Sequence, residues 1–407
     1  MVFCYKLRFN VYLEDVLINI KIEGRDKMSR AISIPRLKER LDKTEKDVKI
    51  ISENIKERQN RPTIKNGQIQ YTLKKAIKKP NFQSKTVLTD STAEYVLNYL
   101  QVIKSSNEVT FYWEQAINFY KATQGLDIIA APLTTYYCFL NATKALLKFK
   151  GIPFDYKHGV SGERVGGHIV LQNELVKIHT SGVLSGLCEY FGEKVNVKED
   201  YTLKNLMYNL PYIHRAYTLT YKNEAELFIP INEPKFVYDS FRGEGWFETQ
   251  LEKEYSNKST LNKLKGFSVD NYYENSNYYT IRRNKTFKWM CSRNTPDTTS
   301  LVSFDKYYQK IRKNTYYIYS PNELWYLKRN DLKPEKMVNK HTLVITMAAM
   351  HRLSELARYY PQILKKHLEK EQGWLLREFI NKSLVQFIDT ISSEITGDDF
   401  RQTGFRN

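Results

Sequence analysis

Apolar and polar positions follow a helical period most clearly between Pro132 and Phe149. The apolar side chains of this stretch recur at three- and four-residue spacing, which places them on one face of a helix: Leu133, Tyr136, Tyr137, Leu140 and Leu147. Pro132 suits a first helical turn, and Gly151 followed by Pro153 ends the helix. The pattern predicts an amphipathic helix with well-defined ends.

Weaker patterns organise the rest of the chain. Alternation within residues 1–25 predicts one or two strands, and a sparse apolar stripe from Leu37 to Arg58 predicts a charge-rich helix. Residues 90–225 show helical spacing, and we expect Ile169–Ile178 to be one of these helices. From residue 226 to 320, short aromatic and β-branched segments between Asn, Gly, Ser and Pro predict antiparallel strands.

The C-terminal part returns to a helical pattern. Ser320-Pro321-Asn322-Glu323 has the form of a capping box with proline in the first turn, so a helix is expected to restart there. Apolar stripes beginning at Leu343 and ending at Ile395 predict long helices that pack back onto residues 90–225. The predicted fold class is therefore mainly α with a β-rich insertion (α+β), built on a helical bundle that is discontinuous in sequence.

Four parts follow from these patterns. We predict an N-terminal strand and charged-helix extension with a basic segment (1–89), a helical bundle (90–225), a β-rich aromatic and basic insertion (226–335) and C-terminal helices (336–407).

Several motifs resemble a known family. The pair Tyr136-Tyr137, then Ala142-Thr-Lys-Ala-Leu-Leu147, Lys150-Gly151 and His158 are similar to the second helix of HEPN domains, which are small helical bundles. With Gly159-Val-Ser-Gly162, Leu353–Pro361 and Gly373–Leu376, the chain resembles the YaaC-like family of bacterial proteins, some of which are methylase-associated. The resemblance covers roughly residues 90–190 and 340–396. It implies a HEPN-like bundle and a role near restriction or antiphage defence, but no catalytic signature.

The charge balance points to polyanionic partners. The chain of 407 residues carries a formal net charge of +18, which is typical of proteins that meet nucleic acid. An AT-rich genome also raises the Lys, Asn, Ile and Tyr content, and this alternative stays open.

Two basic segments are candidate nucleic-acid-binding surfaces. Residues 58–89 hold eight Lys or Arg and no acidic residue, and Lys74, Lys75, Lys78 and Lys79 have the spacing of one helical face. A solvated connector is the alternative. In the β-rich part, tyrosines alternate with cations, as in proteins that hold single strands; the alternative is that these tyrosines form the sheet core. The candidates here are Arg282, Arg283, Lys285, Lys310, Arg312 and Lys313.

A catalytic alternative comes from the HEPN resemblance. HEPN ribonucleases use an Arg and a His on one helix, with four to six residues between them. The nearest match here, Arg164 and His168, has only three intervening residues, two of them glycines. Together with His158, these residues are the catalytic candidates if the protein is a metal-independent ribonuclease.

Other chemistry is not indicated. The four cysteines have no zinc-site spacing, and we expect no metal and no cofactor. No apolar run is long enough to span a membrane and no signal peptide is evident, so a cytoplasmic location is expected.

Three functional hypotheses remain. The preferred one is a nucleic-acid-binding, non-catalytic component of a bacterial restriction or antiphage defence assembly, with DNA or RNA as its partner. The second is a HEPN-like metal-independent ribonuclease. The third is a homodimeric interaction subunit that meets other defence proteins without contacting nucleic acid.

Overall fold

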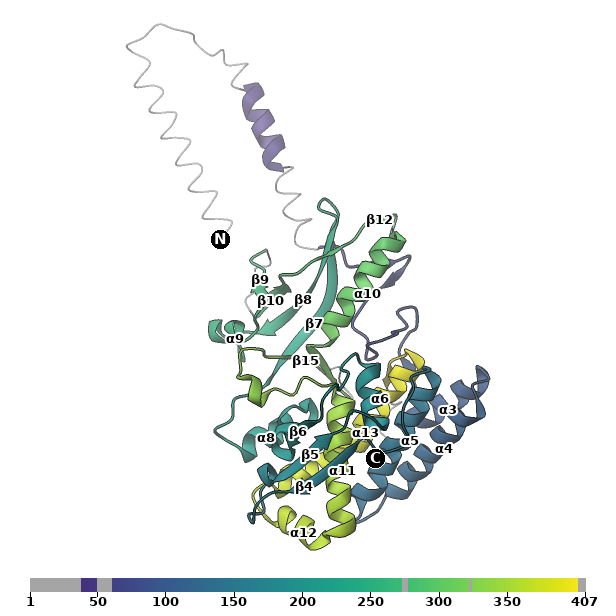
Figure 1. Ribbon diagram of the computed structural model, residues 1–407. Coiled ribbons are helices and arrows are strands. Elements are labelled where there is room, and N and C mark those ends of the chain that lie inside the picture. Colours follow the sequence, from purple (N-terminus) through teal and green to yellow (C-terminus); the bar gives the residue numbers. More distant parts are fainter. Residues whose placement is uncertain (1–37, 50–60, 273–276, 321, 323, 402–407) are drawn as a thin grey trace. The chain divides into compact units, whose positions relative to one another are not determined.

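The computed structural model describes residues 38–49, 61–272, 277–320, 322 and 324–401 (Figure 1). The chain divides into two units, Met1–Asn60 and Arg61–Asn407. In the first unit residues 38–49 are helical, which confirms the predicted charge-rich helix over that range. The strands predicted for residues 1–25 lie outside the described residues. Every element labelled in Figure 1 belongs to the second unit.

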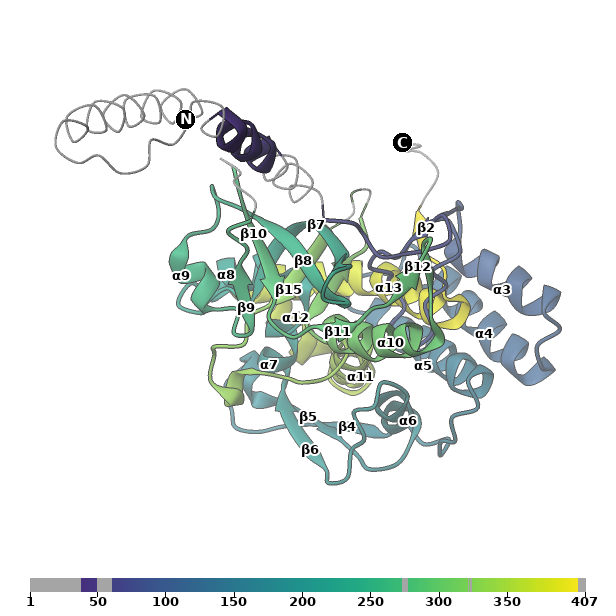
Figure 2. The ribbon, with the colours of Figure 1, turned by 90° about the horizontal axis from the view of Figure 1, so that it is seen from above.

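The central helix of the second unit has the predicted ends. It is α5 (Ala131–Phe149), with Pro132 in its first turn, and Gly151 follows with a φ of 68°. That left-handed conformation suits glycine, which explains the abrupt exit. Long helices surround α5, and Figures 1 and 2 both show α3, α4 and α5 side by side. The long helices α4 (Asn107–Thr123), α11 (Thr342–Tyr359) and α13 (Gly373–Thr396) contact α5, and α3 (Thr92–Val102) packs on α4 and α13.

The predicted fold class is wrong, because a sheet interrupts the segment that was expected to be helical. Strands β4 (Val160–Arg164), β5 (Glu174–Ile178) and β6 (Glu199–Thr202) form a three-stranded antiparallel sheet in the order β4-β5-β6. In β5, buried and half-buried positions alternate with a period of two, which is the period of a strand and not of the helix expected at Ile169–Ile178. The chain is a mixed α/β fold, and the HEPN-like discontinuous bundle does not describe it.

A second, larger sheet lies in the later half of the chain. It has seven antiparallel strands. Six run in the order β14-β15-β7-β8-β10-β9, and the seventh, β11, pairs with β8. Their bounds are β7 (Phe228–Asp239), β8 (Glu244–Glu252), β9 (Phe267–Val269), β10 (Tyr278–Arg283), β11 (Phe287–Lys288), β14 (Thr315–Ile318) and β15 (Leu324–Lys328). The helix expected to restart after Ser320 is therefore wrong, because β15 occupies that place.

Within the same region the structure contains a helix that the strand pattern did not predict. This is α10 (Thr298–Arg312), which starts at Asp297, whose side chain accepts a hydrogen bond from the Ser300 backbone N–H. Figure 2 shows α10 beside β11. Its buried face includes Phe304, Tyr308 and Ile311.

The remaining elements are short. The helices are α6 (Val183–Tyr190), α7 (Leu203–Tyr208), α8 (His214–Thr220), α9 (Lys258–Asn262) and α12 (Pro361–Glu369), and the 3₁₀ turns are Leu171–Asn173, Pro211–Ile213 and Pro334–Lys336. The strands are β1 (Lys65–Asn66), β2 (Ile69–Gln70), β3 (Val87–Leu88), β12 (Cys291–Ser292), β13 (Thr295–Pro296) and β16 (Phe400–Arg401).

Two hydrophobic cores form, and one segment joins them. The larger core gathers the long helices around Phe139 and Phe387, and the smaller gathers the seven-stranded sheet and α10 around Phe236 and Phe304. Residues 71–82, which we call the strap, contact both: Tyr71 and Leu73 belong to the smaller core, and Ile77 belongs to the larger one.

Candidate nucleic-acid interface

A basic cavity lies where the strap, the helical core and the sheet core meet. Its volume is about 1040 Å³, and we call it the basic pocket. Its walls come from the strap, the loop after α6, the segment from the end of β10 to β11, α10, β14, β15 and the segment before α11. Thirteen lysines and arginines line it, against a single acidic residue, Glu193. The pocket therefore carries the charge that the composition predicted for a polyanion partner.

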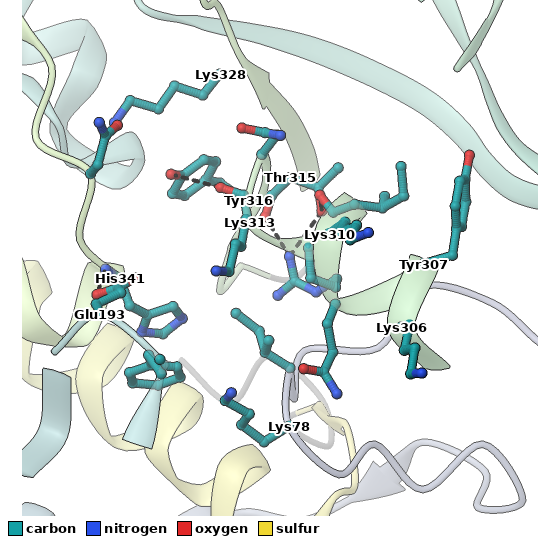
Figure 3. Close-up of a pocket in the computed structure, with 18 of the residues that line it drawn as sticks. Lys78, Glu193, Lys306, Tyr307, Lys310, Lys313, Thr315, Tyr316, Lys328 and His341 are labelled. Carbon is teal, nitrogen blue, oxygen red and sulfur yellow. Dashed lines mark hydrogen bonds between the residues drawn. The ribbon is translucent and has the colours of Figure 1, made fainter. Parts of the chain in front are cut away.

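Seven of the lining lysines have no hydrogen-bond or ion-pair partner among the residues that the structure describes. Their ammonium groups form no hydrogen bond or ion pair with any residue that the structure describes, and all but the half-buried Lys78 are exposed. They are Lys78, Lys194, Lys285, Lys288, Lys306, Lys310 and Lys313. On α10 and its C-cap, Lys306, Lys310 and Lys313 follow helical spacing, so one face of the helix presents three of them. Figure 3 shows these three side chains with Lys78 around the cavity.

The predicted helical face of lysines in the strap is wrong. Lys74 and Lys75 are only 6% and 4% exposed, and the strap is irregular rather than helical. The Lys74 ammonium donates to the Ser84 carbonyl at 2.9 Å, and it lies 3.7 Å from an Asp399 carboxylate oxygen. Lys79 is exposed and lies outside the pocket lining.

Lys75 and Arg312 line the pocket, but their charged groups form hydrogen bonds that stabilise the fold. The Lys75 ammonium donates to both carboxylate oxygens of Asp389, at 2.8 and 2.9 Å, and to the Phe400 carbonyl at 2.8 Å. The Arg312 guanidinium donates to the Lys74 and Lys75 carbonyls, each at 2.9 Å. Both cations thereby fasten the strap, Lys75 to α13 and Arg312 to α10.

The other predicted cations divide between the pocket and the sheet. Arg282 is half-buried outside the pocket, with its guanidinium 4.6 Å from the Trp246 ring centroid. Arg283 lines the pocket and donates to the Lys265 carbonyl at 3.1 Å. Of the ten predicted binding residues, four are unpartnered lysines in the pocket: Lys78, Lys285, Lys310 and Lys313.

Lys194, Lys288 and Lys306 were missing from the predicted set. The alternation of apolar and cationic residues along α10 could have revealed Lys306, because apolar residues recur there at Leu301, Phe304, Tyr308 and Ile311 while lysines occupy the other face. Lys194 reaches the pocket from the helical core, and no local pattern shows that.

The wall of the pocket beside α11 contains groups with shifted pKa values. Burial raises the pKa of Glu193 to about 7 and lowers the pKa of Lys328 to about 7. Glu193 accepts a hydrogen bond from the His341 backbone N–H at 2.9 Å, and Lys328 donates to the Val338 carbonyl at 2.9 Å. Because these two groups titrate near neutral pH, the net charge of the pocket changes across that range.

Among the residues that the structure describes, no hydrogen bond, ion pair or ring contact joins the predicted catalytic side chains of His158, Arg164 and His168 to one another, although the Arg164 guanidinium donates to the Gly167 carbonyl at 3.4 Å. His158 lies before β4, where its Nδ1 is 2.5 Å from the Tyr136 hydroxyl and its ring contacts that of His351. Arg164 lies at the far end of β4, four residues after Val160, or about 13 Å along a strand. His168 is exposed in the connection that follows.

Arg164 instead borders a buried ionic cluster. Its Nε lies 3.7 Å from Glu174, a fully buried carboxylate that also accepts hydrogen bonds from Arg352 at 2.7 and 3.0 Å. His367 Nε2 is 2.9 Å from the other oxygen. Burial alone would raise the pKa of Glu174, but hydrogen bonds from His367 and Arg352 lower it. The cluster ties β5 to α11 and to α12, which is a structural role.

Two further findings concern the described part of the chain, residues 38–49 and 61–401 with its short gaps. It holds no group of three His, Cys, Asp or Glu side chains placed to bind a metal ion. It also holds no helix long and apolar enough to cross a membrane.

Comparisons with known proteins agree with the family resemblance. No curated protein and no solved structure matches the chain. The family model for YaaC-like Protein matches residues 62–395, which span nearly all of the second unit, both cores and the basic pocket. The chain therefore belongs to the YaaC-like family.

Proposed function

We propose that this YaaC-like protein binds nucleic acid and that the basic pocket holds the phosphate backbone. The observation that carries the proposal is the set of seven lysine ammonium groups that line one cavity without a partner among the described residues. Other cations of the same lining, such as Lys75 and Arg312, donate hydrogen bonds within the protein. The pocket thus contains both partnered cations and the seven unpartnered lysines.

Electrostatics supports an anionic ligand. Like charges gathered in one hollow repel each other, and the pocket lining supplies one carboxyl group, Glu193, to offset them. A phosphate chain relieves this repulsion, and its own condensed counterions are released on binding, which favours association. Sequence readout is not required, because phosphate contacts need charge rather than base-specific geometry.

A charge-reversal experiment tests the proposal. The variant Lys306→Glu/Lys310→Glu/Lys313→Glu changes one face of α10, while Lys365→Glu/Lys366→Glu/Lys370→Glu makes the same charge change on α12 and its C-cap. Figure 1 shows α10 and α12 far apart in the second unit. We expect the α10 variant to lose about 100-fold or more in affinity for a mixed oligonucleotide at about 50 mM salt, and the α12 variant to lose only a few-fold. Equal losses in the two variants would contradict the proposal.

The other hypotheses rest on different grounds. Membership of a restriction or antiphage assembly follows from the family's methylase-associated members alone and stays a prediction. An acidic protein partner is the alternative explanation of the same charge, and absence of binding to every nucleic acid at low salt would favour it. The ribonuclease alternative stays a prediction, since no contact in the described part of the chain links His158 to Arg164 or His168.

A further inference from the structure

The unpartnered lysines of the basic pocket stand on more than one wall. Five come from the sheet core, on α10, its C-cap and the segment from β10 to β11: Lys285, Lys288, Lys306, Lys310 and Lys313. Lys78 comes from the strap and Lys194 from the loop after α6. In the view of Figure 3, Lys78 lies across the cavity from Lys313. A ligand that satisfies all these charges must enter the cavity and be contacted from different sides.

The size of the cavity restricts which nucleic acid can enter. A volume of about 1040 Å³ corresponds to a cube roughly 10 Å on each edge. The major groove of a B-form duplex is already about 12 Å wide, and the whole duplex is wider. A duplex could therefore touch the rim but could not lie between the walls, whereas a single strand could.

The spacing of the α10 lysines indicates how long the bound segment is. From Lys306 to Lys313 the helix rises by about 10 Å, at roughly 1.5 Å per residue. Stacked nucleotides of one strand advance by about 3.4 Å each, so this row spans about three phosphates. The other wall adds contacts to the same short segment rather than extending it.

The aromatic side chains of the pocket are largely committed to the protein. The Tyr307 hydroxyl accepts a hydrogen bond from the Phe247 backbone N–H at 3.0 Å, and the Tyr316 hydroxyl donates to the Lys313 carbonyl at 3.3 Å. The Phe191 ring stacks on His341 with centroids 3.8 Å apart. Recognition in this pocket therefore depends on charge more than on stacking, and little preference among bases is expected.

We propose that the basic pocket takes a single-stranded segment of about three to five nucleotides and excludes duplex, an inference that rests on the proposed function. The strand lies between α10 and the strap, and its phosphates meet lysines from both cores. Contacts of this kind tolerate any sequence.

A length series tests this. Labelled single strands of two to twelve nucleotides, a blunt duplex of twelve base pairs and inorganic tripolyphosphate are titrated against the full chain in one low-salt buffer. We expect affinity to rise steeply up to about four nucleotides and then only in proportion to the number of sites, with the duplex at least about tenfold weaker per phosphate. The variant Lys78→Gln/Lys194→Gln should weaken single-strand binding more than duplex binding, with Lys365→Gln/Lys366→Gln as the matched control.

Three other results of these titrations would each overturn one part of the proposal. Duplex binding as tight as single-strand binding would overturn the single-strand inference and leave nucleic-acid binding intact. Tripolyphosphate binding as tight as a tetranucleotide would show a small-polyanion site and overturn the inference. If none of the nucleic acids bound at low salt, the proposed function would fall as well.

Discussion

The salt dependence of binding gives the sharpest measure of the pocket lysines. For single strands, each neutralised phosphate contributes about 0.7 to the slope of log affinity against log salt concentration. The pocket holds seven unpartnered lysines, but a segment of up to about five nucleotides offers them about five phosphates, so the predicted slope is about −3.5 for the unmodified chain. The perturbation is Lys306→Gln/Lys310→Gln/Lys313→Gln, which removes the row that spans about three phosphates, leaves about two of these contacts and predicts a slope of about −1.4.

These slopes correspond to a large difference in an ordinary titration. Between about 50 and 200 mM salt, the unmodified chain should lose roughly 130-fold in affinity and the triple variant roughly 7-fold. Fluorescence anisotropy of a labelled single strand measures both, and the control Lys365→Gln/Lys366→Gln/Lys370→Gln should keep the slope of the unmodified chain. An α10 variant whose slope matched that of this control would refute the assignment of phosphate contacts to α10.

Three other predictions follow from buried or titrating groups. Lys75→Met should lower the free energy of unfolding by about 3–5 kcal/mol in urea titrations, because Asp389 would remain as an uncompensated buried charge. Adding Asp389→Asn should restore part of this stability. If it restores none, loss of the Lys75–Asp389 pair is not the cause of the destabilisation. Nucleic-acid affinity should rise as pH falls from about 8 to 6, because Glu193 loses its negative charge and Lys328 gains a positive charge as each group passes its pKa near 7. The variant Glu193→Gln/Lys328→Met should flatten this pH profile of affinity. An unchanged profile would show that other groups cause the pH dependence. His168→Ala should change stability by less than about 0.5 kcal/mol because the side chain is exposed. Glu174→Ala should cost about 3 kcal/mol or more, because buried Arg352 would keep only Glu355 as a carboxylate partner and buried His367 would lose its own. Thermal unfolding compares the two variants, and equal effects would contradict the structural role of Glu174.

Local signals predicted helix ends well where the chain carries them in adjacent residues. Pro132 and Gly151 bracket α5, as the sequence predicted. These are effects of one or two residues on their own backbone, so no tertiary information is needed.

The errors arose where a short pattern fits two structures. In Glu174–Ile178, apolar residues at alternate positions suited a strand, but the helical neighbourhood suggested a helix. In Thr298–Arg312, tyrosines and phenylalanine suggested strands, although their spacing is also helical. Length and capping at Asp297 would have favoured the helix.

The pocket itself was only partly predictable. The positive charge of the strap and of α10 is visible in the sequence, but which lysines are free depends on distant partners. Lys75 is neutralised by Asp389, more than 300 residues away, and Lys194 joins the pocket from the helical core. Composition therefore predicted a basic surface without separating its ligand-facing cations from its structural ones.

The strap has a consequence for how the second unit can be dissected. Because Lys75, Ile77 and Arg312 connect the strap to α13, the helical core and α10, the binding wall is assembled only when both cores are folded. A fragment that ended near residue 225, or one that began there, would lose either lysines or the anchors that hold them. Ligand and fold are then thermodynamically linked, so a bound strand should slow proteolysis at loops of both cores together. Under the proposed function, the smallest fragment expected to bind nucleic acid is thus the entire stretch from the strap to β16.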